Sequence, residues 1–388
     1  MKQRLFVTLS LAGLAMATFG ATKPKAAIKS LNKTTIQQPT YTEWHDLQVN
    51  AINRFPLHTN FFTYPADDWV SEKDGKIVSK DILHMNKTES KYFLSLDGTW
   101  KFNWVANADQ RPTDFYKEDL DDSNWKTMNV PGNWEMNGFG DPEYVNNGFA
   151  WREHFNEQPP AVPTKDNHVG SYRRIIDIPA NWDGKQVVAH FGSVTSNIYL
   201  YVNGKFAGYA EDSKVAAEFD ITPYLKKGKN LIAFQTFRWC DGSWDEDQDF
   251  WRLSGVARES YLFARDAKLH LEDIRVTPDL VNNYKDGVLN ISTKVKGNGK
   301  LNFILFDKDG KQVATTTGVA KNGTANFSLQ VANPQKWSAE TPYLYTLQVS
   351  LMGAQKKDAM KAASMTPVKV GFRKVEIKNK QFLVNGQP

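Results

Sequence analysis

The sequence predicts an all-β protein made of two β-sandwiches, a jelly roll followed by an immunoglobulin-like domain. Three observations lead to this fold class. Short β-rich runs alternate with turns, long helical periodicity is missing, and Asn-Gly or Asp-Gly pairs separate some of the runs. A chain of 388 residues is also too long for a single hydrophobic core, which predicts more than one domain.

The first 21 residues have the pattern of a secretory signal peptide. Lys2 and Arg4 precede an apolar run that begins at Leu5, and small residues, including Ala17 and Ala21, follow the run. An N-terminal anchor helix is the alternative interpretation. Residues 22–40 are polar and rich in lysine, which predicts a disordered leader. We therefore expect a secreted or periplasmic protein, with no membrane segment beyond the signal peptide.

The first sandwich is predicted over residues 41–265. Eleven of the twelve tryptophans lie before residue 252 and only Trp337 lies after it, which places a domain boundary near residue 265. Asn203-Gly204 separates two β-rich runs and predicts a tight hairpin turn, because both residues tolerate a positive φ. The strands predicted in this domain are 171–179, 186–192, 197–210, 230–239 and 260–264.

The second sandwich is predicted over residues 266–376. Its runs are more regular and less aromatic, and Asp309-Gly310 supplies a hairpin turn between two of them. About seven short strands in roughly a hundred residues match the size of an immunoglobulin-like sandwich. The predicted strands are 271–278, 287–295, 301–307, 311–317, 324–331, 344–352 and 367–377.

The charge of the chain excludes one class of partner, and its cysteine content excludes one kind of covalent stabilisation. The net charge is only +5, from 48 Lys+Arg against 43 Asp+Glu, and no dense basic tract is present, so nucleic acid is excluded as a partner. Cys240 is the single cysteine, so no intrachain disulfide can form. We expect Cys240 to be a small buried thiol.

An acidic and aromatic stretch at residues 241–255 reads DGSWDEDQDFWRLSG. Carboxylates gathered beside apolar surface repel one another and lose hydration, so they need partners, and Arg238, Arg252 and Arg258 are near in sequence. For Glu246 and Asp247 a structural role is favoured. Asp247 and Asp249 could point to the same side of an extended segment, but spacing alone does not raise one pKa for acid catalysis, so this pair is not interpreted as catalytic.

Ordered landmarks along the chain resemble the N-terminal, non-catalytic part of the bacterial glycoside hydrolase family 2 β-galactosidases. They are YTEWHDLQVNAINRFPLHTNFFTYP (41–65), SLDGTWKFNW (95–104), VPGNWEMNGFGDPEYVNN (130–147), VGSYRRIIDIP (169–179), VNGKFAGYAEDSKVAAEFDIT (202–222), the acidic stretch, WSAETPYLYTL (337–347) and VGFRKVEI (370–377). The resemblance implies a jelly-roll sugar-binding domain and an immunoglobulin-like domain. It also implies that residues 377–388 begin a (β/α)₈ barrel that carries both catalytic glutamates and is missing here.

The resemblance implies a retaining hydrolase of terminal β-galactosides, of which this chain alone is inactive and holds no catalytic residue. β-Mannosidases and β-glucuronidases belong to the same family, so the sugar is an expectation. The alternative is a free-standing carbohydrate-binding or scaffolding protein without enzymatic activity. Expected partners are β-galactosides, the missing barrel and a second copy in a homo-oligomer.

Two substrate-binding residues follow from the resemblance. Asn146, in EYVNN, and Asp249, in EDQDFW, match family residues that reach the galactose subsite, and Asp249 acts there partly through a bound sodium ion. Carboxylate and carboxamide groups hydrogen-bond sugar hydroxyls, and hard cations prefer oxygen ligands. Magnesium is expected only in the missing barrel.

Overall fold

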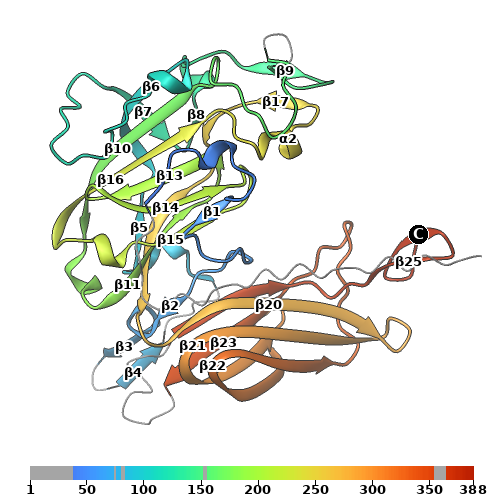
Figure 1. The fold of residues 1–388 in the computed structure, drawn as a ribbon. Helices are drawn as coiled ribbons and strands as arrows, with labels where there is room; N and C mark the ends of the chain where they lie inside the picture. The colour runs from blue at the N-terminus through green and yellow to red at the C-terminus, as the bar shows by residue number, and fades with distance from the viewer. Residues whose placement is uncertain (1–37, 74–75, 80–83, 152–154, 354–363) are drawn as a thin grey trace, which may run out of the picture. The chain divides into compact units, whose positions relative to one another are not determined.

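The computed structural model describes residues 38–73, 76–79, 84–151, 155–353 and 364–388, and strands dominate it (Figure 1). The predicted all-β class is confirmed. The predicted signal peptide and residues 22–37 of the predicted leader lie outside the described residues. The helical segments are single turns: α1 (Ala66–Trp69), α2 (Ser243–Glu246) and the 3-10 turns Glu43–His45, Lys87–Glu89, Ala108–Gln110, Glu135–Asn137, Ala180–Trp182 and Thr222–Tyr224.

A seven-stranded antiparallel sheet forms one layer of the first sandwich. Its order is β1-β14-β13-β16-β10-β6-β7. The strands are β1 (Ala51–Ile52), β14 (Lys205–Glu211), β13 (Asn197–Val202), β16 (Gly228–Phe237), β10 (Val169–Ile178), β6 (Gly98–Val105) and β7 (Lys126–Val130). The predicted turn between β13 and β14 is confirmed, since Asn203 and Gly204 have φ values of 50° and 75°.

A four-stranded sheet forms the second layer, in the order β15-β11-β19-β5. Its strands are β15 (Ala217–Asp220), β11 (Lys185–Phe191), β19 (Ser260–Asp266) and β5 (Phe93–Ser95). The two sheets share one apolar core, in which the rings of Phe191 and Phe234 lie 5.3 Å apart. The layers approach closely at Gly208, where a Cβ atom would lie 2.4 Å from the ring of Phe219.

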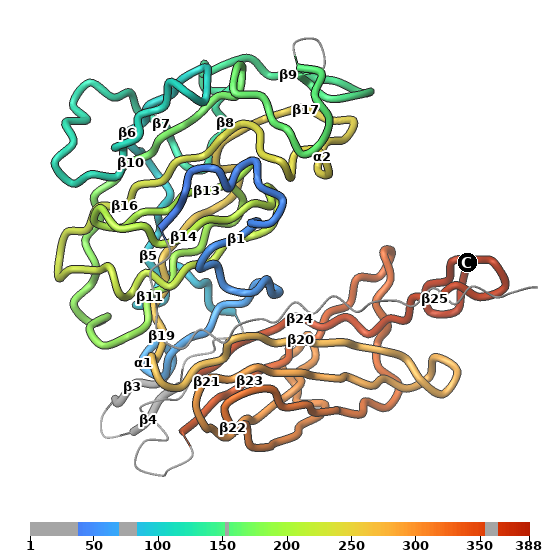
Figure 2. Tube along the Cα trace, in the orientation of Figure 1, coloured from blue at the N-terminus to red at the C-terminus, as the bar shows by residue number. Residues whose placement is uncertain are grey.

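Two small sheets extend the first sandwich at one end. One has the order β12-β18-β8, and the other is a two-stranded ribbon of β9 and β17, which lie side by side in both views (Figures 1 and 2). Their strands are β12 (Val194–Thr195), β18 (Gly255–Val256), β8 (Gly132–Asn133), β9 (Glu143–Val145) and β17 (Phe250–Arg252). The acidic and aromatic stretch runs through α2 into β17.

The second sandwich contains a sheet in the order β2-β24-β23-β21-β20, and β22 also pairs with β21. Its strands are β2 (Tyr64–Pro65), β24 (Ser364–Val370), β23 (Tyr345–Gly353), β21 (Asp286–Phe306), β20 (His270–Val281) and β22 (Gln312–Val331). A separate core, which includes Leu289, Phe303 and Leu347, fills it. Two hairpins complete the described chain: β3 (Val70–Lys73) with β4 (Lys76–Ser79), and β25 (Val375–Lys378) with β26 (Gln381–Val384).

Several strands of the second sandwich differ from the prediction. The predicted strands 287–295 and 301–307 are one strand, β21, and 311–317 with 324–331 are one strand, β22. A bulge at Gly297, with φ at 80°, bends β21, so that its first part pairs with β20 and its second part with β23. The predicted strand 367–377 is instead two elements, since β24 ends at Val370 and β25 starts at Val375.

Among the described residues, no helix combines the length and the apolar character needed to cross a lipid bilayer.

Candidate sugar-binding ribbon

The acidic stretch begins with a compact turn that packs its half-buried aromatic residue, Trp244, against the core of the first sandwich. The backbone N–H groups of Ser243 and Trp244 donate to the carbonyls of Cys240 and Asp241, and one turn of α2 follows. The Trp244 ring packs edge-on against Trp151, and its Nε1 donates to the carbonyl of Ala161. Trp244 therefore belongs to the packing of the loop rather than to a sugar platform. Cys240 is fully buried, as predicted.

Asp247 is a structural residue, as predicted from the sequence. Its Oδ1 lies 2.5 Å from a guanidinium nitrogen of Arg252, and both side chains are less than a tenth exposed. Burial raises the pKa of Asp247, and the charge of Arg252 opposes that rise. The predicted structural role of Glu246 has a different partner from the expected arginines, because its Oε1 accepts the backbone N–H of Ser213.

The ribbon of β9 and β17 brings the two predicted sugar-binding residues to one end. Val145 pairs with Phe250, so Asn146 follows β9 directly where Asp249 precedes β17 directly. Both residues are exposed. These positions lie about a hundred residues apart in the sequence, and only the antiparallel pairing places them next to one another.

An exposed aromatic pair lies beside these residues. Tyr144 and Trp251 are paired across the ribbon, their ring centroids are 5.5 Å apart, and they are 52% and 56% exposed. The Tyr144 hydroxyl donates to Oδ1 of Asp249, and this hydrogen bond raises the pKa of Tyr144. Exposed aromatic rings offer an apolar face to the C–H groups of a sugar ring, while the adjacent carboxylate and amide serve its hydroxyls.

Two buried arginines hold the ribbon. Arg252 donates to the carbonyls of Val145 and Phe250, which ties the two strands together. Arg238 is 1% exposed, lies 3.3 Å from Oε2 of Glu143, and also donates to the carbonyl of Asp141. Arg252 thus ties the two strands of the ribbon to each other and to Asp247. Arg238, which follows β16 directly, ties β9 to the body of the first sandwich.

His168 forms a further contact of Arg238. Its Nδ1 lies 3.2 Å from the Arg238 guanidinium, and burial together with that charge lowers the pKa of His168 to about 4. A neutral imidazole at physiological pH is consistent with this position beside a cation. Arg258, the third predicted partner of the acidic stretch, donates instead to the carbonyl of Lys214.

A buried carboxylate pair lies behind the acidic stretch, and only one of its two members belongs to that stretch. Glu211 on β14 and Asp241 interact, and burial, opposed by a hydrogen bond from Tyr209, raises the pKa of Glu211 to about 9. Ligand atoms of Glu211, Cys240 and Asp241 lie within 4.8 Å of one another, an arrangement that could hold a cation. Sequence reasoning missed Glu211, and only the run AEDS after a predicted strand hinted at it.

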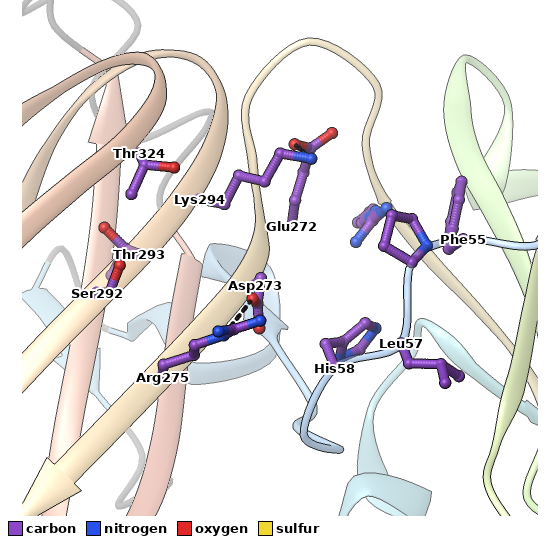
Figure 3. Close-up of a pocket in the computed structure, with 12 residues that line it drawn as sticks. Phe55, Leu57, His58, Glu272, Asp273, Arg275, Ser292, Thr293, Lys294 and Thr324 are labelled. Atoms are coloured by element: carbon purple, nitrogen blue, oxygen red, sulfur yellow. Dashed lines mark ion pairs between the residues drawn. The ribbon is translucent and has the colours of Figure 1, made fainter. Parts of the chain in front are cut away.

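One pocket among the described residues carries its acids in ion pairs. A pocket of about 390 Å³ is lined by His58 and Leu57 on one side and by residues of β20 and β21 on the other (Figure 3). Within it Arg275 lies 3.5 Å from Asp273, and Lys294 lies 3.2 Å from Glu272. Each of its acids thus has a cationic partner, unlike the pair of facing acids that glycoside hydrolysis requires.

Comparison with known protein families matches both sandwiches. Residues 93–266 match the model described as "Glycosyl hydrolases family 2, sugar binding domain", and residues 269–373 match "Glycosyl hydrolases family 2". These two matches agree with the predicted order of a jelly-roll sugar-binding domain and an immunoglobulin-like domain.

Similar curated proteins are bacterial β-galactosidases. The chain is 36% identical over 360 residues to the β-galactosidase of Priestia megaterium, which covers 89% of this chain and 33% of that enzyme. It is 38% identical over 311 residues to the enzyme of Streptococcus thermophilus, covering 79% and 30%. The β-galactosidase large subunit of Leuconostoc lactis is 32% identical over 362 residues, covering 88% and 54%. The chain thus spans about a third of the length of the first two relatives.

Solved structures share the fold at lower identity. A β-glucuronidase of Bifidobacterium dentium has a TM-score of 0.61 at 19% identity, covering 77% of this chain and 51% of that one. A family 2 glycosyl hydrolase of Bacteroides cellulosilyticus has a TM-score of 0.58 at 23% identity, covering 76% and 38%. At these identities the likeness concerns the fold alone.

Proposed function

The chain belongs to glycosyl hydrolases family 2, and from this membership we propose that it is the N-terminal, sugar-binding part of a secreted β-galactosidase. Its relatives named as β-galactosidases are about three times longer than the matched region, so the catalytic domain is assigned to the part that these residues do not cover. The two carboxyl groups of retaining hydrolysis would lie in that domain, together with any magnesium.

The ribbon is the proposed contribution of this chain to the sugar subsite. The observation that carries the proposal is the meeting of Asn146 and Asp249 at one end of β9 and β17, beside exposed Tyr144 and Trp251. Asn146 and Asp249 would hydrogen-bond galactose hydroxyls. The buried arginines would keep the ribbon in position while a sugar binds, because a preformed site loses less entropy on binding.

Asp249 is also the proposed sodium ligand. It is exposed and offers a carboxylate oxygen beside the one that accepts the Tyr144 hydroxyl. We expect β-galactosidase activity of the assembled enzyme to rise when sodium replaces potassium at constant ionic strength. Asp249→Asn should remove that sodium dependence, and an unchanged dependence would contradict the assignment.

Catalysis by this chain alone is not expected. Asp247 is held in an ion pair by Arg252, and Asp249 is exposed and accepts the Tyr144 hydroxyl, an arrangement unlike the two facing carboxyl groups that retaining hydrolysis requires. The proposed activity therefore needs the catalytic domain as a partner. The name of the Leuconostoc lactis relative, a large subunit, indicates that such an enzyme can be divided between polypeptides.

Reconstitution tests the proposal. The purified chain is assayed on p-nitrophenyl β-D-galactoside alone and mixed with the remainder of the Priestia megaterium enzyme, made as a separate polypeptide. We expect no turnover by the chain alone and turnover by the mixture. Asn146→Ala or Asp249→Ala should lower kcat/KM of the mixture about tenfold or more, since one lost sugar hydrogen bond costs about 1.4 kcal/mol.

Asp245→Ala is the matched control, because Asp245 is an exposed acid of the same loop that lies in α2 rather than at the start of β17. It should leave kcat/KM unchanged. Robust turnover by the chain alone would overturn the proposal. Micromolar binding of galactose to the chain alone, measured by calorimetry, would favour a free-standing carbohydrate-binding protein, because half a subsite offers too few contacts for such affinity.

Export and self-association belong to the same proposal. Residues 1–21 are the proposed signal peptide, and a homo-oligomer is the proposed assembly of the complete enzyme. A reporter enzyme fused after residue 40 should appear outside the cytoplasm of a bacterial host, and Leu5→Arg with Leu11→Arg should retain it inside by breaking the apolar run.

A further inference from the structure

The pocket of about 390 Å³ has a polar wall that is built on β20, β21 and β22 (Figure 3). Asp273 of β20 lies opposite Lys294 of β21, and Arg275 lies opposite Ser292. On the other side of β21, Thr324 of β22 lies opposite Lys294. Residues that are paired across neighbouring strands point to the same face of a sheet, so these five side chains gather on one face.

A β-bulge adds one more acid to the polar wall. Leu271 pairs with Val295 and Asp273 pairs with Lys294, so Glu272 is the extra residue of the bulge. In a regular strand Glu272 and Asp273 would point to opposite faces, yet both line the pocket. Bulges re-aim side chains and are frequent beside active sites, so this pair of adjacent acids indicates a wall shaped for a ligand.

The charges of the polar wall form two ion pairs. Nζ of Lys294 lies 3.2 Å from Oε2 of Glu272, and Nε of Arg275 lies 3.5 Å from Oδ2 of Asp273. Each pair thus presents a charged donor beside a charged acceptor. A charged ligand would meet like charge as well as opposite charge here, whereas a hydroxyl group both donates and accepts hydrogen bonds and suits either member. The wall therefore favours a neutral ligand that is rich in hydroxyl groups.

One acceptor of the polar wall is left open. Oδ1 of Asp273 is buried and has no hydrogen-bond partner in the part of the chain that the structure describes. Buried polar atoms are almost always paired, either within the protein or with a bound molecule. This oxygen therefore indicates a donor that comes from outside the described residues.

The opposite wall is apolar and belongs to residues 55–58. Figure 3 shows Phe55 and Leu57 across the pocket from Asp273 and Arg275. Leu57 is 42% exposed, and Pro56 also lines this side. The C–H faces of a sugar ring pack on apolar surface of this kind while its hydroxyl groups turn to polar partners.

Both walls are held in place by contacts within the chain. The backbone N–H of Phe55 donates to the carbonyl of Glu218 on β15, which fixes the apolar wall to the first sandwich. Arg265 is buried and donates to the side chain of Gln186 on β11 and to the carbonyl of Leu271 on β20. A pocket whose walls are already in place loses less entropy when a ligand binds.

We propose that this pocket is a second carbohydrate site, which binds a neutral oligosaccharide and takes no part in hydrolysis. Its volume of about 390 Å³ lies in the range of small-molecule sites. Asn146 and Asp249 of the ribbon are not among its lining residues. The inference goes beyond the proposed function and does not rest on it, because it uses no residue of the ribbon.

Saturation-transfer NMR with lactose tests the second site. The starting protein is the chain with Asn146→Ala and Asp249→Ala, in which the ribbon contributes no sugar binding; we call it the ribbon-silent chain. We expect saturation to pass from this protein to the lactose protons, with a Kd in the millimolar range. The affinity should be weak because an open pocket leaves part of the sugar in water.

Two tryptophan variants of the ribbon-silent chain locate the binding. Thr324→Trp places an indole ring in the pocket and should weaken lactose binding at least tenfold. Thr317→Trp is the matched control, because Thr317 is an exposed threonine of the same strand that does not line the pocket, and it should leave binding unchanged. Equal binding by the two variants, or no transfer to lactose from the ribbon-silent chain, would overturn the second site while the proposed role of the ribbon stands.

A thermal melt separates binding from folding. Thr324→Trp and Thr317→Trp should melt at the same temperature, because both threonines are exposed. Glu272→Gln is a second binding variant that adds no bulk and removes one charged acceptor from the wall. It should weaken lactose binding about threefold or more, and unchanged binding would overturn the role of the polar wall.

Lactobionate tests the neutral character of the ligand, because it is lactose oxidised to a carboxylate at its reducing end. It should bind no more tightly than lactose, and lactose binding should not depend on the concentration of sodium chloride. Tighter binding of lactobionate would assign the pocket to an anion and overturn the proposal.

The reconstituted enzyme tests the separation from hydrolysis. Thr324→Trp, made in the chain with an intact ribbon, should leave kcat/KM for p-nitrophenyl β-D-galactoside unchanged. A tenfold loss at an unchanged melting temperature would make the pocket part of the catalytic site and would overturn the non-catalytic role.

Discussion

Nε2 of His58 lies 3.0 Å from Oε2 of Glu218, and the two residues are 160 positions apart in the sequence. Nδ1 of His190 lies 2.8 Å from the other oxygen of the same carboxylate. Glu218 is thus enclosed by two imidazoles, one from a strand of the first sandwich and one from the segment that leads to β2. Burial alone would raise the pKa of Glu218, but the hydrogen bonds and charges of the two histidines outweigh it and lower the pKa to about 2.

This arrangement predicts a pH window for stability. The hydrogen bond to Glu218 raises the pKa of His58. The stabilisation of the folded chain by protonated His58 is therefore complete below the ordinary histidine pKa of 6.5, and it is lost as pH rises through the raised pKa. Glu218 contributes above its ordinary value of 4.5, and its contribution is lost as pH falls toward 2. The stabilisation should therefore be largest between pH 4.5 and 6.5. Melting temperatures of the original chain and Glu218→Gln from pH 4 to 9 measure it.

The difference between the two proteins should reach about 2 kcal/mol in that window and shrink above it. Lys117→Gln, which removes one member of an exposed ion pair with Asp114, is a control that should show no such window. A difference that stays constant from pH 5 to 9 would exclude a role for His58 protonation.

Arg252→Ala should loosen the ribbon and destabilise the first sandwich. The change leaves Asp247 buried without its cation and removes the bonds to the carbonyls of Val145 and Phe250, a loss of about 3–5 kcal/mol. The double variant Arg252→Ala, Asp247→Asn should recover part of the loss, because no buried charge remains. Urea unfolding measures both values, and equal destabilisation of the single and double variants would mean that Asp247 contributes nothing.

Truncation of Trp151 should lower the stability of the chain, whereas truncation of Trp251 should affect sugar binding and hardly change stability. Trp151 is 1% exposed within the core, so Trp151→Ala should cost about 3–5 kcal/mol of unfolding free energy. Trp251 is 56% exposed, so Trp251→Ala should change stability by no more than about 0.5 kcal/mol. In the reconstituted enzyme Trp251→Ala should nevertheless raise KM, and an unchanged KM would remove Trp251 from the proposed sugar subsite.

Glu211→Gln should stabilise the chain at alkaline pH. Burial raises the pKa of Glu211 from 4.5 to about 9, so between these values the folded chain keeps a proton that the unfolded chain has released. Stability should consequently fall as pH rises through this window, and the neutral amide should abolish that fall. At pH 8, with a chelator present, we expect the variant to be about 2 kcal/mol more stable. If the variant were less stable than the original chain at pH 8, the ionised carboxylate of Glu211 would be shown to stabilise the folded chain.

Local patterns predicted five runs of the first sandwich that match β10, β11, the hairpin of β13 and β14, β16 and β19, because turn residues and alternation are local signals. The turn at Asn203 and Gly204 is an example, since two adjacent residues that both tolerate a positive φ are enough to predict it. The other strands of its two layers, β1, β5, β6, β7 and β15, were not predicted. The bend in β21 was not predictable, because GNGK at 297–300 reads as a turn while its backbone pairs with two different strands. Asn146 and Asp249 could be nominated only through the family resemblance, and the two-stranded register explains why they lie together.

The buried groups behind the ribbon were harder to foresee. Glu211 and Asp241 lie on different elements, and their interaction depends on packing across the sandwich rather than on spacing. The partner of Glu246 is a backbone N–H, for which no side-chain pattern gives a signal. Long-range contacts of this kind decide the electrostatics of the loop.

The pairing of β2 with β24 places residues 64 and 65 in a sheet whose other strands begin at residue 270 or later. Severing the gene at the junction near residue 266 would therefore strip a border strand from the downstream half. The hydrogen-bonding groups of β24 would then be left unsatisfied, inviting aggregation. Residues 64 and 65, which come from the N-terminal part of the chain, thus complete the sheet of the second sandwich. This pairing favours keeping both sandwiches in one polypeptide.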